Sequence, residues 1–406
     1  MLKSVPVKRR LTLLGPAFVA AVAYVDPGNV ATNVTAGARF GFTLVWVVVL
    51  ANVMAVLVQY LSAKLGIVTG NSLAEHMGKQ LPRGVRLVYW AQAEIVAIAT
   101  DIAEIVGGAV ALYLLFDIPL VPGAIITTLV SILILKFGDW FGQSALERLI
   151  MCFLALIAVG FTAGLFVDAP RPGDVASGLI PAFSGSDSVL LASAIIGATV
   201  MPHVIYLHSG LTSGRLGMRS DGISIRQLIA ATRVDVVIAL IIAGALNLSL
   251  LLVAATSLNG FPGTDSLEGV HTLIGSELGV GVALLFAVAL LGSGLASTSV
   301  GCAAGAEVMQ GLLNRRIPVL LRRVVTVIPA LVVLAAGVEP GYALIVSQVV
   351  LSIGIPFALV PLLWLTARRS VMGEHVNQRG TTVAAGGVVT IVVALNFALL
   401  GLTFAG

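Results

Sequence analysis

Apolar stretches long enough to cross a lipid bilayer recur along this chain, and they constrain its fold more than any other feature. A membrane helix needs about 20 apolar residues to cross roughly 30 Å of hydrocarbon. The connections between the apolar stretches are short, so they leave no room for a separate soluble domain. The eleven segments that qualify lie near residues 12–38, 43–66, 86–115, 119–136, 147–167, 188–214, 233–256, 279–309, 318–338, 342–366 and 382–404.

The composition agrees with this pattern. Of the 406 residues, 58% are hydrophobic and only 10% are charged, whereas a soluble domain carries about 25% charged residues. We therefore predict an all-α polytopic membrane protein in which residues 1–406 form a single transmembrane domain. The two cysteines, Cys152 and Cys302, lie in apolar runs and offer neither a disulfide framework nor the spacing of a metal finger.

The distribution of charge predicts how the chain is oriented. All but Arg39 and Arg171 of the 23 Lys and Arg residues lie on one side of the expected topology. Because such residues concentrate in cytoplasmic loops, we expect the N-terminus inside and the C-terminus outside. The basic start of the chain is then the cytoplasmic flank of the first span, not a cleaved signal. The short loops and small size favour a bacterial plasma membrane. The net charge of +4 follows this topology and does not indicate nucleic-acid binding.

Two spans contain a helix breaker in their middle. The stretch AYVDPGNVATN puts Asp26 and Pro27 inside the first span, and Pro202 interrupts the sixth. Non-helical backbone at this depth is tolerated only where it is buried in protein or lines a cavity. We therefore expect both breaks to lie inside the protein near the middle of the bilayer.

The positions of the two breaks indicate an inverted repeat. The sixth span is the first of a second group of five, as the first span begins the first group. An odd number of spans per group reverses the direction of the second group, which is typical of secondary transporters with discontinuous helices. We predict one five-helix repeat over 12–167, a second over 188–366, and an eleventh helix over 382–404.

The breaks offer a mixed set of metal ligands. Asp26 supplies a carboxylate, Asn29 an amide oxygen, Met201 a thioether, and the unwound backbone supplies free carbonyls. Oxygen ligands suit Mn²⁺, Mg²⁺ and Ca²⁺, but a thioether adds affinity only for a softer ion. The set therefore favours a divalent transition metal. The alternative is that Met201 fills a gap in an apolar core.

The third span carries acids on one helical face. Glu94, Asp101 and Glu104 are separated by seven and three residues, which aligns them along the helix. Charges inside a membrane are costly and usually mark an ion or proton route. The alternative is structural ion pairing, for which Arg322 and Arg323 are the natural partners.

Two histidines follow the second break. His203 directly follows Pro202 and could take a proton near neutral pH; alternatively, it is a buried histidine bonded to a carbonyl. His208 shares a face with Arg215, which indicates either a gating contact or plain packing.

Because a metal binds only the ionised carboxylate of Asp26, a proton and a metal compete there. Metal entry that displaces this proton would link the two fluxes.

Two polar positions inside spans receive no functional role. Asn247 begins an Asn-Leu-Ser triplet that matches a glycosylation pattern, but its place within a span makes the match a chance one. Ser293 lies in Gly292-Ser293-Gly294, which we interpret as a site of close helix packing.

An ordered set of motifs resembles one family. These are DPGN in span one, MPH in span six, GIVTGNSLAEH after span two, ATDIAE in span three and SQVVLSIGIPFALVPL in span ten. The set resembles the Nramp family of proton-coupled divalent-metal transporters (natural resistance-associated macrophage proteins), which includes bacterial manganese transporters. The resemblance covers nearly the whole chain and implies a LeuT-type fold with broken helices one and six. Some relatives have a twelfth span, and we expect none in this sequence.

The resemblance also implies roles for individual residues. It assigns metal ligation to the side chains of Asp26, Asn29 and Met201, to the carbonyls of Ala23 and Ala198, and, in an occluded state, to Gln348. It assigns a proton path to Asp101 and Glu104, with Arg322 and Arg323 pairing on its inner stretch and Glu94 extending it towards the cytoplasm. Since relatives without the methionine accept magnesium, Met201 argues for Mn²⁺ or Fe²⁺.

We therefore expect a monomeric secondary importer of Mn²⁺ and Fe²⁺ that is coupled to proton entry by alternating access. Its partners are metal ions, protons and the bilayer; no enzymatic activity and no permanently bound cofactor are expected. A sodium-coupled carrier of organic solutes is an alternative, but Asp26 would repel a substrate carboxylate. A passive cation channel lacks a ring of charges, and a membrane metalloenzyme lacks a histidine ligand set.

Overall fold

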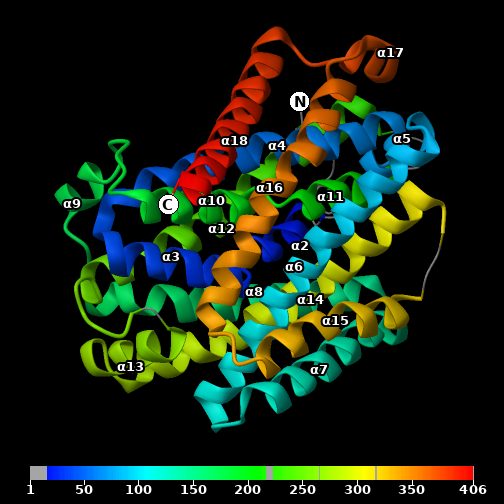
Figure 1. Cartoon of the computed structure of the whole chain (residues 1–406). Helices are drawn as coiled ribbons and strands as arrows, with labels where there is room; N and C mark the ends of the chain where they lie inside the picture. Colours follow the sequence, from blue (N-terminus) through cyan, green and yellow to red (C-terminus); the bar gives the residue numbers. More distant parts are fainter. Residues whose placement is uncertain (1–15, 216–222, 265, 316–317, 406) are drawn as a thin grey trace.

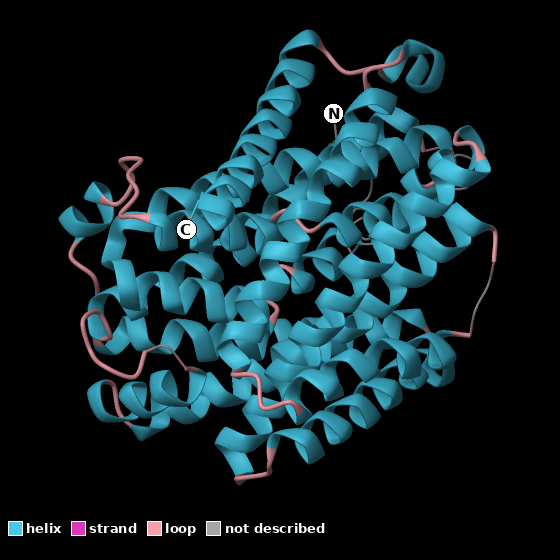
Figure 2. Cartoon of the chain, viewed as in Figure 1, coloured by secondary structure: helices cyan, strands magenta, loops and turns pink. Residues whose placement is uncertain are grey.

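The computed structural model describes residues 16–215, 223–264, 266–315 and 318–405. Figure 2 shows helices joined by loops throughout this part of the chain. In chain order the elements are α2 (Pro16–Ala23), α3 (Pro27–Phe40), η2 (Gly41–Leu44), α4 (Val45–Thr69), α5 (Leu73–Gln80), α6 (Arg83–Phe116), α7 (Leu120–Phe141), α8 (Gln143–Val167), α9 (Pro172–Ser177), α10 (Ser186–Thr199), α11 (Pro202–Ser213), α12 (Ile225–Ser257), α13 (Leu267–Glu277), α14 (Val280–Leu313), α15 (Val319–Ala335), α16 (Pro340–Thr366), α17 (Arg369–Met372), η4 (Gly373–His375) and α18 (Arg379–Ala405).

The eleven expected spans all correspond to helices. Within the described residues, nine helical segments are long and apolar enough to cross a membrane. One of them, Pro27–Thr69, contains the second half of the first span together with the whole of the second. The ninth span, α15, is shorter, with 17 residues, and is not one of these nine segments. The predicted all-α, eleven-span fold is confirmed.

Several span boundaries were wrong. Helix α12 begins at Ile225, before the expected 233, and α14 continues to Leu313, beyond the expected 309. Hydropathy locates the hydrocarbon part of a helix, but a well-capped helix continues past it. At α12, Ser224 and Gln227 form a reciprocal capping box that fixes this earlier start.

Some residues used in the topology prediction lie outside the described part of the chain. They are 12–15 of the first span and the charged residues Lys3, Lys8, Arg9, Arg10, Arg219, Asp265 and Arg316. The orientation of the chain in the membrane stays a prediction.

Both predicted helix breaks are present. Helix α2 ends at Ala23 and α3 begins at Pro27, while α10 ends at Thr199 and α11 begins at Pro202. A proline has no N–H group and its ring clashes with the carbonyl four residues earlier. At the first position of a new helix neither property is a disadvantage. Each proline therefore ends one half-helix and starts the next.

The packing of the helices has the internal symmetry of an inverted repeat. Helix α3 of the first group packs against α12 of the second, and α11 of the second packs against α4 of the first. Spans three and ten, α6 and α16, pack together, and so do their counterparts in the repeat, spans eight and five, α14 and α8. Helix α6 also packs against its own counterpart, α14. Figure 1 shows the half-helices near the centre of the molecule, with α7, α13 and α15 towards one edge. The repeat boundaries at 12–167 and 188–366 stay a prediction.

Glycines allow the symmetry-related helices to approach closely. A Cβ atom on Gly37 of α3 would overlap the backbone of α12 at Leu251, and one on Gly66 of α4 would overlap the backbone of α11 at Ser209. Because backbone atoms cannot move aside as the end of a side chain can, a larger residue would separate each pair. These contacts hold α3, which follows the first break, against α12, and they hold α11, which follows the second break, against α4.

Candidate functional site

The two helix breaks meet directly, and one side chain joins them. The amide nitrogen Nδ2 of Asn29 donates to Oδ1 of Asp26 at 2.8 Å and to the backbone carbonyl of Ala198 at 2.9 Å. Asp26 and Asn29 belong to the first break, whereas Ala198 belongs to the last turn of α10. Segments that are 169 residues apart in sequence are therefore in contact at the centre of the fold.

The carbonyls of Ala23 and Ala198 lose their helical partners for the same reason. In an α-helix a carbonyl accepts from the N–H four residues later. For Ala23 that residue is Pro27, and for Ala198 it is Pro202, and neither has an N–H group. The sequence thus creates one freed carbonyl in each break.

Besides Oγ1 of Thr199, three carboxylate and amide oxygens at the breaks are buried without a hydrogen-bond partner among the described residues. They are Oδ2 of Asp26, Oδ1 of Asn29 and Oε1 of Gln348. The side chain of Gln348 comes from α16 and occupies the space that a Cβ atom on Gly28 would need. Buried acceptors without partners are costly and call for an explanation. Three such acceptors around two joined breaks make this region a candidate cation site.

Met201 lies in the second break, three residues after Ala198 and directly before α11. It is fully buried, so its thioether belongs to the same interior region as the oxygens. No group of three or more His, Cys, Asp and Glu residues that could hold a metal occurs in the part of the chain that the structure describes. The candidate site instead combines one carboxylate with amide, carbonyl and thioether groups.

The remaining carbonyls of the first break are satisfied by residues to which the sequence analysis gave no role. Nδ2 of Asn247 in α12 donates to the carbonyl of Tyr24 at 2.8 Å, and the hydroxyl of Ser293 in α14 donates to the carbonyl of Val25. The signal that could have found them is a polar side chain in the middle of an apolar span. Both residues fix the unwound backbone against neighbouring helices.

The acids of the third span lie against α15. Arg323 forms ion pairs with Asp101 and, at 3.7 Å, with Glu104, while Arg322 pairs with Glu94 at 2.9 Å. The resemblance implied that Arg322 and Arg323 pair along the inner stretch of a proton path, and in the structure each arginine pairs with acids of α6. Asp101, Glu104 and Arg323 are almost completely buried.

Helix α6 touches both breaks on either side of its acids. Oγ1 of Thr100 lies 3.3 Å from Nδ1 of His203, just after the second break. Gly107 packs against the ring of Pro27 in the first break. Asp101 and Glu104 lie between these two contacts along the helix, so they are within a few residues of both breaks.

His208 connects to the first break through a neutral side chain. Its Nδ1 lies 2.8 Å from Oε1 of Gln59, whose Nε2 donates to the hydroxyl of Tyr24 at 2.6 Å. Arg215 donates to Oγ1 of Thr232 in α12 at 3.2 Å. A gating role for His208 or Arg215 stays a prediction.

Comparisons with known proteins show the family of the chain. A family model of natural resistance-associated macrophage protein-like proteins matches residues 17–402. The chain belongs to this Nramp family. It is 55% identical over 394 residues to the divalent metal cation transporter MntH of Mycobacterium tuberculosis (strain H37Rv), covering 97% of this chain and 92% of the relative. It is 44% identical over 397 residues to MntH of Bacillus subtilis (strain 168), with coverage of 97% and 93%.

Solved structures support the same fold. A crystal structure of the Eremococcus coleocola manganese transporter, in complex with an aromatic bis-isothiourea compound, superimposes with a TM-score of 0.86 at 32% identity. The match covers 97% of this chain and 87% of that one. The nucleobase-cation-symport-1 transporter Mhp1 matches with a TM-score of 0.57 at 15% identity, which is evidence for the LeuT-type fold alone.

The burial of Arg323 leads to a prediction about stability. Arg323→Met leaves Asp101 and Glu104 buried without their ion-pair partner, which costs about 3–5 kcal/mol. We expect a marked loss of thermal stability in detergent, measured by the fraction of monodisperse protein after heating. The double variant Arg323→Met/Asp101→Asn should recover part of the loss.

The control is Arg39→Met. Arg39 pairs with Asp187, but both side chains are exposed, at 41% and 58%, so this change should cost about 1 kcal/mol or less. Equal losses for Arg323→Met and Arg39→Met would contradict the assignment of a buried ion pair.

Proposed function

We propose that this Nramp protein is a secondary active importer of Mn²⁺, and also of Fe²⁺, coupled to proton entry by alternating access. The observation that carries the proposal is the set of unpartnered oxygens of Asp26, Asn29 and Gln348 at the two joined breaks. Relatives named divalent metal cation transporter and a structural neighbour named manganese transporter support it.

The proposed ligands need only a small rearrangement to bind a metal. The Asn29 amide now directs its nitrogen at Asp26 and at the carbonyl of Ala198. A half-turn of this amide would direct Oδ1 the same way and would release the carbonyl of Ala198, while Oδ1 of Asp26 would keep its hydrogen bond from the backbone N–H of Asn29. The metal would then bind the side chains of Asp26, Asn29 and Met201 and the carbonyls of Ala23 and Ala198, with Gln348 added in an occluded state.

Burial of the site favours a transporter over a channel. The exposed fraction is 1% for Asp26 and 0% for Asn29, Met201 and Gln348. A continuously open pore would leave such ligands in contact with water. A site that is closed on both sides fits an intermediate of alternating access, in which helices move around a central site.

The local geometry argues against an organic-solute carrier. In such carriers the N-terminus of a half-helix receives the carboxylate of the substrate. Here Asp26 caps α3, and its Oδ1 accepts from the backbone N–H of Asn29 at 2.8 Å. The protein's own carboxylate thus occupies the position that a substrate carboxylate would need.

The acids of α6 form the proposed proton path. Asp101 and Glu104 lie between the contacts of α6 with the two breaks, and each has a carboxylate oxygen without a hydrogen bond among the described residues. A proton leaving Asp26 when the metal binds would pass to His203 or to these acids. Glu94, paired with Arg322, would extend the path towards the cytoplasm.

The distribution of Lys and Arg supports a cytoplasmic N-terminus and an outer C-terminus. We propose a monomer in a bacterial plasma membrane, with metal ions and protons as its substrates and no resident cofactor.

The thioether argument predicts a change in selectivity. In proteoliposomes with an inward proton gradient, the wild type should take up Mn²⁺ in the presence of excess Mg²⁺ and Ca²⁺. Met201→Leu keeps the side-chain volume but removes the sulfur, so Mg²⁺ should now compete strongly with Mn²⁺. Competition is measured as the Mg²⁺ concentration that halves Mn²⁺ uptake.

Met54→Leu is the matched control, because Met54 is also buried, in α4. It should leave this concentration unchanged. If Met201→Leu and Met54→Leu resist Mg²⁺ equally, Met201 is a packing residue. If a correctly folded wild type takes up no Mn²⁺, the proposed function itself fails.

Glu104→Gln separates a proton path from structural ion pairing. The variant is isosteric and leaves Asp101 as the partner of Arg323, so the fold should be retained. We expect Mn²⁺ entry to continue while the accompanying acidification, followed by a pH-sensitive dye inside the vesicles, falls strongly. Unchanged acidification per Mn²⁺ ion would assign Glu104 to ion pairing alone.

A further inference from the structure

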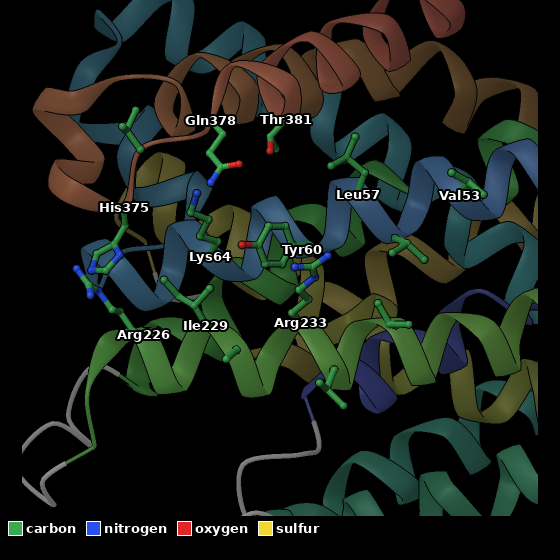
Figure 3. A pocket seen from close by; sticks show the side chains of 15 residues that line it. Val53, Leu57, Tyr60, Lys64, Arg226, Ile229, Arg233, His375, Gln378 and Thr381 are labelled. Atoms are coloured by element: carbon green, nitrogen blue, oxygen red, sulfur yellow. The ribbon is translucent and has the colours of Figure 1, made fainter. Parts of the chain in front are cut away.

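A cavity of about 860 Å³ lies between α4, α12 and the segment that leads into α18. Figure 3 shows Lys64, Arg226, Arg233 and His375 around this space, with Gln378 and Thr381 on the side of α18. These residues lie at the membrane face that we propose to be cytoplasmic. None of the side chains assigned to metal binding or proton transfer lines the cavity.

The cavity carries an excess of positive charge. Lys64, Arg226 and Arg233 line it together with His375, and none of its described lining residues is acidic. Arg226 has Glu374 within 3.8 Å, but both side chains are largely exposed, at 73% and 81%, so this ion pair contributes little.

Lys64 is the most buried of these cations. Its Nζ donates to Oδ1 of Asn377 at 2.9 Å, and a neutral amide does not cancel its charge. A buried ammonium group is costly unless it faces an anion. The cavity therefore has the electrostatics of an anion site.

The other end of the cavity is apolar and open to the surrounding lipid. Val53 precedes Lys64 by eleven residues on α4, and Val237 follows Arg226 by eleven on α12, so each lies roughly 16 Å further along its helix. Figure 3 shows Val53 at the end of the cavity away from Lys64 and His375. Val53 is 62% exposed and Val234, also in the lining, is 41% exposed.

We propose that this cavity binds an anionic phospholipid of the cytoplasmic leaflet, with its phosphate near Lys64, Arg226 and Arg233 and an acyl chain along Val53 and Val237. A free phosphate ion shares the headgroup chemistry, but it would leave the valine-lined end unfilled. The bound lipid joins α4 of the first helix group to α12 of the second. This inference does not depend on which metal the protein carries.

Native mass spectrometry of the full chain in detergent tests the proposal. The probes are phosphatidylglycerol, phosphatidylcholine and inorganic phosphate, each titrated separately. The wild type should retain one phosphatidylglycerol in preference to phosphatidylcholine. Arg226→Gln/Arg233→Gln should weaken phosphatidylglycerol binding about 25-fold, from a loss of roughly fivefold per cation.

The control, Arg83→Gln/Arg369→Gln, removes two exposed cations from the same face outside the cavity and should leave the affinity unchanged. A second variant, Ala230→Trp, fills the cavity without changing its charge. This variant should also lose phosphatidylglycerol binding. Such a loss distinguishes binding inside the cavity from a general attraction of the lipid to positive charge. Each variant is first checked for a monodisperse elution profile.

Four results would overturn the proposal. Equal binding of phosphatidylglycerol and phosphatidylcholine would show that charge does not select the lipid, and equal losses in the test and control variants would show that the cavity is not the site. Retention of inorganic phosphate together with its displacement of phosphatidylglycerol would assign the cavity to a soluble anion. A mass of two chains that Ala230→Trp reduces to one would show that a second copy covers the cavity.

Discussion

Every backbone polar group in the middle of a bilayer must find a partner inside the protein, and two prolines prevent this from happening in the usual way. Pro27 and Pro202 deprive the carbonyls of Ala23 and Ala198 of their helical donors. Unwound backbone at this depth would be untenable on a surface that faces lipid. The rest of the fold surrounds these breaks, with α12, α14 and α16 each contributing a polar side chain to them.

The polar groups at the breaks form two sets, one with hydrogen-bond partners on the surrounding helices and one without. Asn247 and Ser293 satisfy the carbonyls of Tyr24 and Val25 and hold that part of the first break in a fixed conformation. On the side where the second break approaches, oxygens of Asp26, Asn29 and Gln348 stay without partners among the described residues. A rigid backbone with unsatisfied acceptors is the arrangement expected of a preorganised cation site. Helix α6 then brings buried acids close to the same point, as the proposed coupling of metal and proton movement requires.

The sequence predicted the features that depend on local chemistry. The spans follow from hydrophobicity, and the breaks follow from proline within an apolar run. The early start of α12 was missed because a capped helix can extend beyond the hydrocarbon. Asn247 and Ser293 were missed because their partners lie 223 and 268 residues away, a distance at which a single sequence contains no pairing signal.

The adjacent arginines of α15 illustrate a further limit. Neighbouring residues on a helix point about 100° apart, so the pairing of Arg322 and Arg323 depends on how the helix is rotated against α6. In the structure Arg323 faces Asp101 and Glu104, whereas Arg322 faces Glu94. Only the packing of the two helices decides between them.

The central claim is that a transition metal binds between the two breaks with both oxygen and sulfur ligands. Anomalous X-ray scattering from crystals soaked in Mn²⁺ tests it most directly, because the signal locates the metal without reference to activity. The account predicts one strong peak at bonding distance from the carboxylate of Asp26 and the sulfur of Met201, and its loss in Asp26→Asn. A peak bonded to other residues, or an empty centre in Mn²⁺-soaked crystals, would contradict it.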